Sequence, residues 1–265
     1  MTENMTNQEI LRIAMEQSAL DLGADAADFE KSENVTVISK ENERARKYLK
    51  LPFSCQIVSY GSNAVASVSP EFYGIAEEYI NKYPVEHLFE TPNLHFLNDA
   101  LEKMGQRICF MAEYFLPDVE LLRSCADMNT CHYKLKILTQ SDFADLYLPE
   151  WSNALCEARK QLDVLGIGAY DGDTLVGLAA CSADCDTMWQ IGIDVLPEYR
   201  RQGIASTLTS RLAVEILENG KVPFYCAAWS NVKSVRNAIK SAFRPAWVEM
   251  TARPRKTVDT MNGLV

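Results

Sequence analysis

The residues best suited to chemistry lie in the segment Ile191 to Asn219, around one glycine-containing turn. Arg200, Arg201, Gln202 and Gly203 form this turn. Gly203 lets a ligand approach the backbone without meeting a Cβ atom, and the first N–H groups of a helix starting here have no partner inside the helix. Such N–H groups lie at the positive end of the helix dipole and bind phosphate well. The turn therefore predicts an anion-binding site.

A strand before the turn and a helix after it must hold this site. Ile191, Ile193 and Val195 alternate as in a β-strand and are β-branched. After the turn, apolar residues recur every four positions, which is the pattern of an amphipathic helix. These residues are Ile204, Leu208, Leu212 and Ile216. The order is therefore strand, turn and helix.

The rest of the second half supplies further strands around this unit. Asp171-Gly172-Asp173 is a hairpin signal between two apolar runs. Ser141 can cap a helix that runs towards Leu162 and is interrupted at Pro149. The strands predicted here are Tyr133–Leu138, Leu165–Tyr170, Thr174–Cys181, Met188–Val195, Pro223–Ala228 and Ala246–Met250, with a helix over Asn231–Ala242.

The first half is predicted to form a smaller α/β domain without a motif that we can connect to a reaction. Strong helix formers predict a helix over Ser39–Leu51, and two short β-like runs around Gly61 predict a hairpin. Polar residues between Pro117 and Thr130 predict a linker or a domain edge. We therefore expect two domains, residues 1–130 and 131–265, with the first helping to wall the acceptor site of the second.

Composition narrows the classes of partner. The formal net charge of −10 disfavours nucleic acid, because an acidic surface repels a phosphate backbone, and it favours cationic molecules. No apolar run approaches the roughly 18 residues that span a bilayer, and the polar N-terminus lacks the features of a signal peptide. We therefore expect a cytoplasmic protein without a membrane partner.

The eight cysteines do not form a metal-binding pattern. They contain no C-x-x-C pair, and the nearest approach to a cluster is Cys125, Cys131 and His132, for which no fourth ligand is evident. We expect no metal site. The phosphate-binding motifs of ATP-binding and dinucleotide-binding domains are also missing from the sequence.

The order of elements resembles the GNAT superfamily of N-acetyltransferases. The family fingerprint [QR]-x-x-G-x-[GA] is filled by Arg200, Gly203 and Ala205, between a strand and an amphipathic helix. An N-x-x-S segment, Asn231 and Ser234, follows one strand later as in the family's second cofactor segment. This resemblance covers about half of the chain. It implies an α/β (α+β) fold with a mixed, mostly antiparallel sheet flanked by helices, plus the smaller N-terminal α/β domain.

The resemblance implies acetyl-CoA as the co-substrate. Its pyrophosphate would be bound by the turn and its pantetheine arm by the end of the preceding strand, with the backbone of Val195 also near the thioester carbonyl. Gly203 could instead ease a turn, and Asn231 could only cap its helix. The cofactor-binding residues that the resemblance implies are Ile193, Val195, Arg200, Arg201, Gln202, Gly203, Ile204, Ala205, Ser206, Asn231 and Ser234.

Two positions depart from the family pattern and leave the proton transfers unassigned. Ala238 stands where many relatives have a tyrosine acid, and Trp189 stands where many have a glutamate base. Asp194 is the nearest titratable side chain and is the candidate base, although it could equally serve as a cap or face solvent.

The resemblance implies direct transfer of an acetyl group to a primary amine in a ternary complex. The acceptor is a small molecule or a peptide of unidentified structure, and the acidic composition favours a cation. The alternative is a non-catalytic acyl-CoA-binding module, motivated by the missing acid and base. The sequence leaves the oligomeric state open, a homodimer included.

Overall fold

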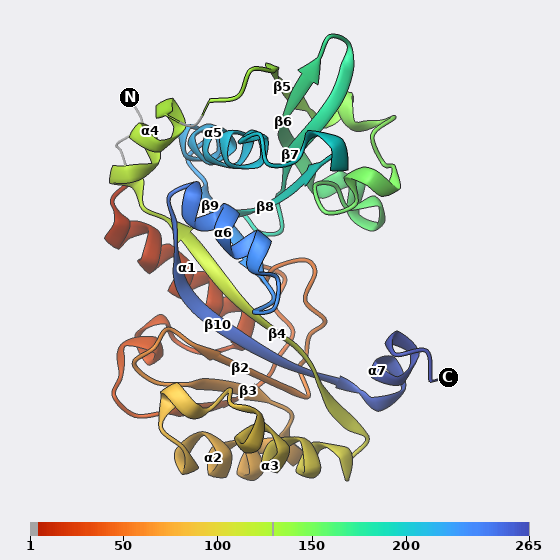
Figure 1. Cartoon of the computed structure of the whole chain (residues 1–265). Helices are drawn as coiled ribbons and strands as arrows, with labels where there is room; N and C mark the ends of the chain where they lie inside the picture. Colours follow the sequence, from red (N-terminus) through yellow and green to blue (C-terminus); the bar gives the residue numbers. More distant parts are fainter. Residues whose placement is uncertain (1–4, 129, 265) are drawn as a thin grey trace. The chain divides into compact units, whose positions relative to one another are not determined.

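A computed structural model describes residues 5–128 and 130–264, which divide into two compact units (Figure 1). Unit 1 consists of residues 5–13 and Phe115–Pro245, and unit 2 consists of Ala14–Tyr114 and residues 246–264. None of the described helices combines the length and the apolar composition needed to cross a membrane.

This division differs from the expected boundary near residue 130. The N-terminal residues 5–13 belong to unit 1, and the C-terminal residues 246–264 belong to unit 2. Helix α1 (Asn7–Leu22) begins in unit 1, where the side chain of Asn7 accepts a hydrogen bond from the backbone N–H of Val119 at 2.8 Å. Strands β4 (Gln106–Pro117) and β10 (Phe243–Pro254) each contribute residues to both units. A fragment starting at residue 131 would therefore lack parts of unit 1.

Unit 1 contains a sheet in which β9, β8, β7, β6 and β5 are neighbours in that order. The strands β5, β6, β7 and β8 pair antiparallel, and β8 and β9 pair parallel. This confirms the meander predicted from the hairpin signals. Their bounds are β5 (Lys134–Thr139), β6 (Asp163–Asp171), β7 (Thr174–Ser182), β8 (Met188–Val195) and β9 (Val222–Ala227).

Helix α5 (Ile204–Glu218) packs across β6, β7, β8 and β9. Its apolar stripe, Ile204, Leu208, Leu212 and Ile216, is buried in the main core of the unit, as the four-residue spacing predicts. Helices α4 (Val119–Met128) and α6 (Val232–Lys240) pack against α5. A separate core joins β5 and β7 to the short helices η4 (Gln140–Phe143) and η5 (Pro149–Trp151), which precede η6 (Glu157–Leu162).

Unit 2 contains β1 (Val35–Ile38), β3 (Val65–Val68), β2 (Cys55–Ser59), β10 and β4 as neighbours in that order. Its core combines apolar residues of β2 and β3 with those of α2 (Tyr73–Lys82) and α3 (Thr91–Glu102). The remaining elements are η1 (Ala26–Glu30), η2 (Pro70–Phe72), η3 (Val85–His87) and α7 (Arg255–Met261). The mixed, mostly antiparallel strands with flanking helices agree with the predicted fold class.

Two local predictions were wrong. Residues 39–51 form no helix, because Arg46 is buried in an ionic cluster that holds this segment in a loop: its guanidinium pairs with Asp21 and, at 2.6 Å, with Glu249. A buried charge requires such partners, and they override the helix propensity of the segment. The helix expected from Ser141 towards Leu162 is absent as well, because this segment forms the three short helices η4, η5 and η6. Residues 117–130, expected as a linker or domain edge, contain α4, whose Leu122 and Ala126 are buried.

Candidate functional site

The strands β8 and β9 pair only over their first residues. Met188, Trp189 and Gln190 lie opposite Val222, Pro223 and Phe224, and in the described part of the chain the ladder ends there. Both strands continue, β8 to Val195 and β9 to Ala227. The last five residues of β8 therefore have an edge on which no neighbouring strand pairs within the described residues.

The backbone groups of Ile193 and Val195 point to that open edge. The N–H of Leu196 donates to the carbonyl of Val176 in β7 at 3.0 Å, so the backbone groups of Leu196 face β7. Backbone N–H and C=O groups alternate between the two edges of a strand, so those of Val195 and Ile193 face the other way. These are the two residues whose backbone was expected to contact a pantetheine arm.

The turn between β8 and α5 contains a row of backbone donors without a protein acceptor among the described residues. Gly203 caps α5 with a left-handed φ of 81°, and the first helical hydrogen bond runs from the N–H of Thr207 to the carbonyl of Gly203 at 3.0 Å. In the part of the chain that the structure describes, the N–H groups of Gln202 to Ser206 have no acceptor. Unpaired donors at a helix N-terminus form a site for an anion.

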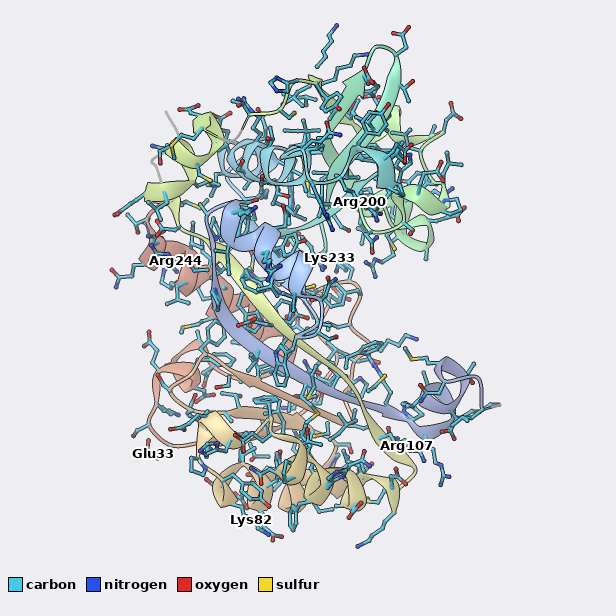
Figure 2. All side chains as sticks on the ribbon, in the orientation of Figure 1. Glu33, Lys82, Arg107, Arg200, Lys233 and Arg244 are labelled. Carbon is cyan, nitrogen blue, oxygen red and sulfur yellow. The ribbon has the colours of Figure 1, made fainter. Side chains whose placement is uncertain are left out.

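The side chains around this turn are partly engaged in holding it. The guanidinium Nε of Arg200 donates to the carbonyl of Val195 at 3.0 Å, and the hydroxyl of Ser206 donates to the carbonyl of Gly203 at 3.1 Å. Arg200 lies exposed at the end of β8 (Figure 2). Arg201 is exposed and has a left-handed φ of 64°, which is unusual for a residue with a Cβ atom. Both arginines leave positive charge beside the free donors.

Two tyrosines that the sequence reasoning missed brace the turn. The hydroxyl of Tyr133 donates to the side-chain oxygen of Gln202 at 2.7 Å, and its ring packs edge-on against Tyr199. The hydroxyl of Tyr199 in turn donates to Asp171 at 3.2 Å, and this hydrogen bond raises the pKa of Tyr199. The side chain of Gln202 is thus fixed, which leaves its backbone N–H as the group open to a ligand.

Asn231 and Ser234 form the cap of helix α6. The side-chain oxygen of Asn231 accepts from the backbone N–H of Ser234 at 3.2 Å, which is the N-cap role considered for it from the sequence. The hydroxyl of Ser234 lies 2.7 Å from that of Tyr225 in β9. Burial raises the pKa of Tyr225, so this pair is a neutral hydrogen bond. Asn231 is exposed, and within the described residues its side-chain nitrogen has no hydrogen-bond partner.

The carboxylate of Asp194 is occupied by the loop after η5. Its oxygens accept from the backbone N–H groups of Asn153 at 2.8 Å and Ala154 at 2.9 Å, and from the Asn153 side chain at 2.7 Å. The same loop touches β8 at Gly192, where an added Cβ would lie 1.9 Å from the carbonyl oxygen of Asn153. Asp194 therefore has a structural role as a loop anchor, which argues against its expected role as a base.

At the two positions that depart from the family pattern, Trp189 and Ala238, the side chains cannot act as an acid or a base. Trp189 packs against the main core, and Ala238 is fully buried. The side-chain nitrogen of Gln190 donates to the sulfur of Cys226 at 3.0 Å, from β8 to β9, just where their pairing ends. Among the described residues, no three His, Cys, Asp or Glu side chains gather in a group that could hold a metal ion.

Comparisons with known proteins can be set against this geometry. The sequence profile described as GNAT acetyltransferase matches residues 76–245, more than half of the chain. A comparison with curated proteins found no match.

Several solved structures are similar to parts of the chain. A GCN5-related N-acetyltransferase-like protein from Streptococcus suis is 20% identical, with a TM-score of 0.45, 61% of this chain covered and 69% of that one. A GNAT-family acetyltransferase from Colwellia psychrerythraea is 15% identical, with a TM-score of 0.43 and coverages of 71% and 75%. An aminoglycoside N-acetyltransferase in complex with CoA is 17% identical, with a TM-score of 0.32 and coverages of 45% and 92%.

Proposed function

The chain belongs to the GNAT acetyltransferase family, and from that premise we propose that it transfers an acetyl group from acetyl-CoA to a primary amine. The observation that carries this proposal is the row of unpaired backbone donors from Gln202 to Ser206, at the start of α5. A diphosphate is the part of acetyl-CoA that such a row suits, because each N–H can donate to an anionic oxygen. Arg200 and Arg201 add positive charge beside it.

The open edge of β8 supports the second part of the cofactor proposal. The backbone groups of Ile193 are available there to bond the amides of a pantetheine arm, and the N–H of Val195 could stabilise a developing oxyanion at the thioester carbonyl. The carbonyl of Val195 already accepts from the guanidinium of Arg200. Asn231 would contribute its amide nitrogen, while its oxygen continues to cap α6. The hydroxyl of Ser206 can turn from the Gly203 carbonyl to the phosphate without breaking a backbone bond.

The proposed reaction is a direct attack. The neutral amine nitrogen forms a bond to the acetyl carbon, the carbon–sulfur bond breaks, and the amine proton leaves to solvent while the thiolate of CoA is released. Asp194 is held by three donors and Ala238 carries no acid, so this reaction depends mainly on positioning. We therefore expect kcat/KM to rise with pH up to the pKa of the acceptor amine, and to follow that pKa when the acceptor is changed.

The charge of the chain supports a cationic acceptor. A formal net charge of −10 attracts cations and raises their local concentration near the surface. Amino sugars, polyamines and lysine-containing peptides carry both the positive charge and the primary amine that the reaction needs. The proposed acceptor is therefore a cationic primary amine.

A second candidate function is a non-catalytic module that binds acyl-CoA. It is favoured by the same two observations, the occupied carboxylate of Asp194 and the apolar Ala238. It predicts binding of acetyl-CoA without acceptor-dependent release of the thiol.

A thiol-release assay separates the two candidates. Purified protein is given acetyl-CoA and a panel of aminoglycosides, polyamines, amino acids and peptides, and free CoA is measured against acceptor-free samples. Release that depends on an amine, with a matching acetylated product by mass spectrometry, is the expected result. Acetyl-CoA binding with no release over the whole panel would favour the binding module, and no acetyl-CoA binding at all would refute both.

A further inference from the structure

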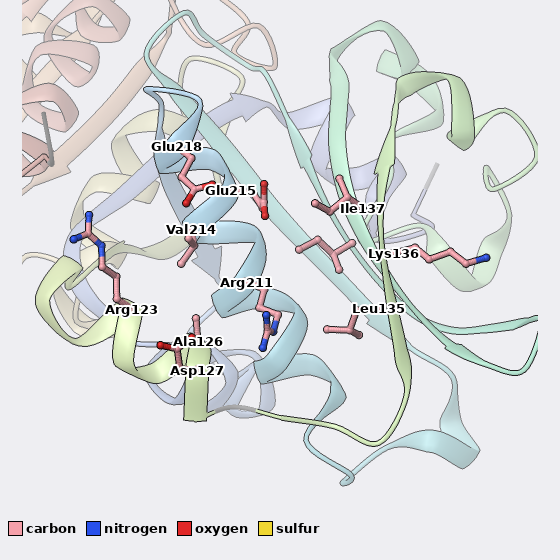
Figure 3. A pocket seen from close by; sticks show the side chains of 11 residues that line it. Arg123, Ala126, Asp127, Leu135, Lys136, Ile137, Arg211, Val214, Glu215 and Glu218 are labelled. Atoms are coloured by element: carbon pink, nitrogen blue, oxygen red, sulfur yellow. The ribbon is translucent and has the colours of Figure 1, made fainter. Parts of the chain in front are cut away.

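Unit 1 contains a groove away from the turn at Gly203. It has a volume of about 400 Å³ and lies between α4, β5 and the later half of α5 (Figure 3). Arg211, which lines it, lies about two helical turns beyond Gly203 on α5. A volume of this size is within the range of small-molecule sites.

Arg211 is the residue of the groove that most strongly indicates a bound ligand. It is half-buried, its Nε atom is shielded from solvent, and in the described part of the chain this atom has no hydrogen-bond partner. Its guanidinium also makes no ion pair within the described residues. A buried donor without an acceptor costs free energy. A guanidinium in this state suits a carboxylate, which it can bind through two parallel hydrogen bonds.

The wall opposite Arg211 is apolar. In Figure 3, Leu135 and Ile137 of β5 point towards α5, whereas Lys136 between them points the other way. Ile137 is 56% exposed, although a side chain of this kind is normally buried. Val214 lines the groove from α5, the helix that carries Arg211. The groove therefore offers contact to an apolar group beside the guanidinium.

Two carboxylates lie one and two helical turns beyond Arg211 on α5. Glu215 and Glu218 both line the groove, and burial together with the charge of Glu218 raises the pKa of Glu215. Two like charges one turn apart on a helix repel each other. An ammonium group placed beside them would relieve that repulsion.

We propose that this groove binds a small zwitterion of the class of apolar α-amino acids. Its carboxylate would bind Arg211, its ammonium group would lie beside Glu215 and Glu218, and its side chain would pack on Leu135, Ile137 and Val214. The proposal is independent of the acyl-transfer reaction.

The first test measures the binding of a matched set of ligands to the unmodified full chain by calorimetry. L-leucine is compared with isoamylamine, which lacks the carboxylate, with isocaproate, which lacks the ammonium group, and with glycine, which lacks the apolar body. L-leucine should bind, and each of the other three should bind roughly tenfold more weakly or worse. Equal binding of all four, or no heat from L-leucine, L-phenylalanine and L-methionine up to about 10 mM, overturns the proposal.

The second test uses variants that lose the same charge. Arg211→Met keeps the length and packing of the side chain and should weaken L-leucine binding roughly tenfold or more. Lys134→Gln should leave it unchanged, because Lys134 is an exposed residue of β5 that does not line the groove. Thermal unfolding of both variants checks that they remain folded. If Arg211→Met does not fold, Glu215→Gln, which should weaken L-leucine but not isocaproate, decides the matter. Equal binding by Arg211→Met and Lys134→Gln contradicts the assignment of Arg211.

Discussion

The carboxylate of Asp194 and the backbone donors of Gln202 to Ser206 lie at the two ends of one strand-to-helix connection, and they differ in what they bond. Asp194 accepts from three N–H groups of the loop after η5. The donors at the start of α5 have no acceptor within the described residues. One end of the connection is therefore bonded within the protein, and the other leaves its donors open to water or to a ligand.

This difference changes how the two ends should be assigned. The first N–H groups of a helix lie at the positive end of its dipole and favour an anion, so a row of donors without a protein acceptor is the stronger indication of binding. A carboxylate that already holds a loop is a weaker candidate for moving protons, even beside a proposed reaction centre. The four predictions below test this assignment from the largest expected effect to the smallest.

Replacing Gly203 with valine should have the largest effect. A β-branched residue resists the φ of 81° that aligns the free donors, so we expect acetyl-CoA to bind roughly 100-fold more weakly in calorimetry. Gly220→Val is the matched control, because Gly220 has a φ of 70° just beyond the other end of α5. Both variants should lose similar stability in thermal unfolding, and equal loss of acetyl-CoA binding in both would contradict the role of the turn.

Replacing Gly192 with alanine tests the loop that Asp194 holds. The added Cβ would lie 1.9 Å from the carbonyl oxygen of Asn153, so the loop must move. We expect the free energy of unfolding to fall by about 1–3 kcal/mol, with little change in acetyl-CoA affinity. Gly74→Ala is the control, since it has no atom within 4 Å of the new Cβ in helix α2. A variant as stable as the Gly74→Ala control would show that the loop does not rest on β8.

Replacing Asp194 with asparagine tests whether this carboxylate is an anchor or a base. An anchor should lose about 1–2 kcal/mol of stability, because one amide group cannot accept all three hydrogen bonds. The pH dependence of kcat/KM should keep its shape. Asp186→Asn, at an exposed turn, is the control. Loss of the acidic limb of the pH profile together with unchanged stability would make Asp194 the base after all.

Replacing Arg201 with glycine should give small effects of opposite sign. Glycine adopts the left-handed φ of 64° without strain, so thermal stability should rise by up to about 1 kcal/mol. Acetyl-CoA should bind a few-fold more weakly, because one exposed positive charge is lost. Arg201→Asn tolerates the same φ and loses the same charge, so it should match glycine in binding. Affinity unchanged in both variants would remove Arg201 from the site.

The features that were predicted well depend on residues close together in the sequence. The turn at Gly203, the stripe on α5 and the hairpin at Gly172 each follow from spacing within one or two elements. The fold class followed because the order of these elements is itself a local pattern.

The features that were missed depend on partners far apart in the sequence. Asp194 is bonded by Asn153, and Arg46 is held in a loop by Asp21 and Glu249, so neither environment can be derived from local spacing. Arg211 lies between two apolar positions of a predicted helix. Its lack of a partner cannot be predicted from the sequence, because it depends on how β5 lies beside α5. Strands β4 and β10 contribute residues to both units, which spacing along the sequence does not show.

Nuclear magnetic resonance of isotope-labelled protein titrated with acetyl-CoA tests the central claim most directly. Backbone amides that begin to donate to phosphate shift strongly, so we predict the largest shifts at Gly203, Ile204, Ala205 and Ser206. The amides of Asn153 and Ala154, which already donate to Asp194, should change little. Saturable binding with the start of α5 unmoved and the main shifts elsewhere would contradict the account.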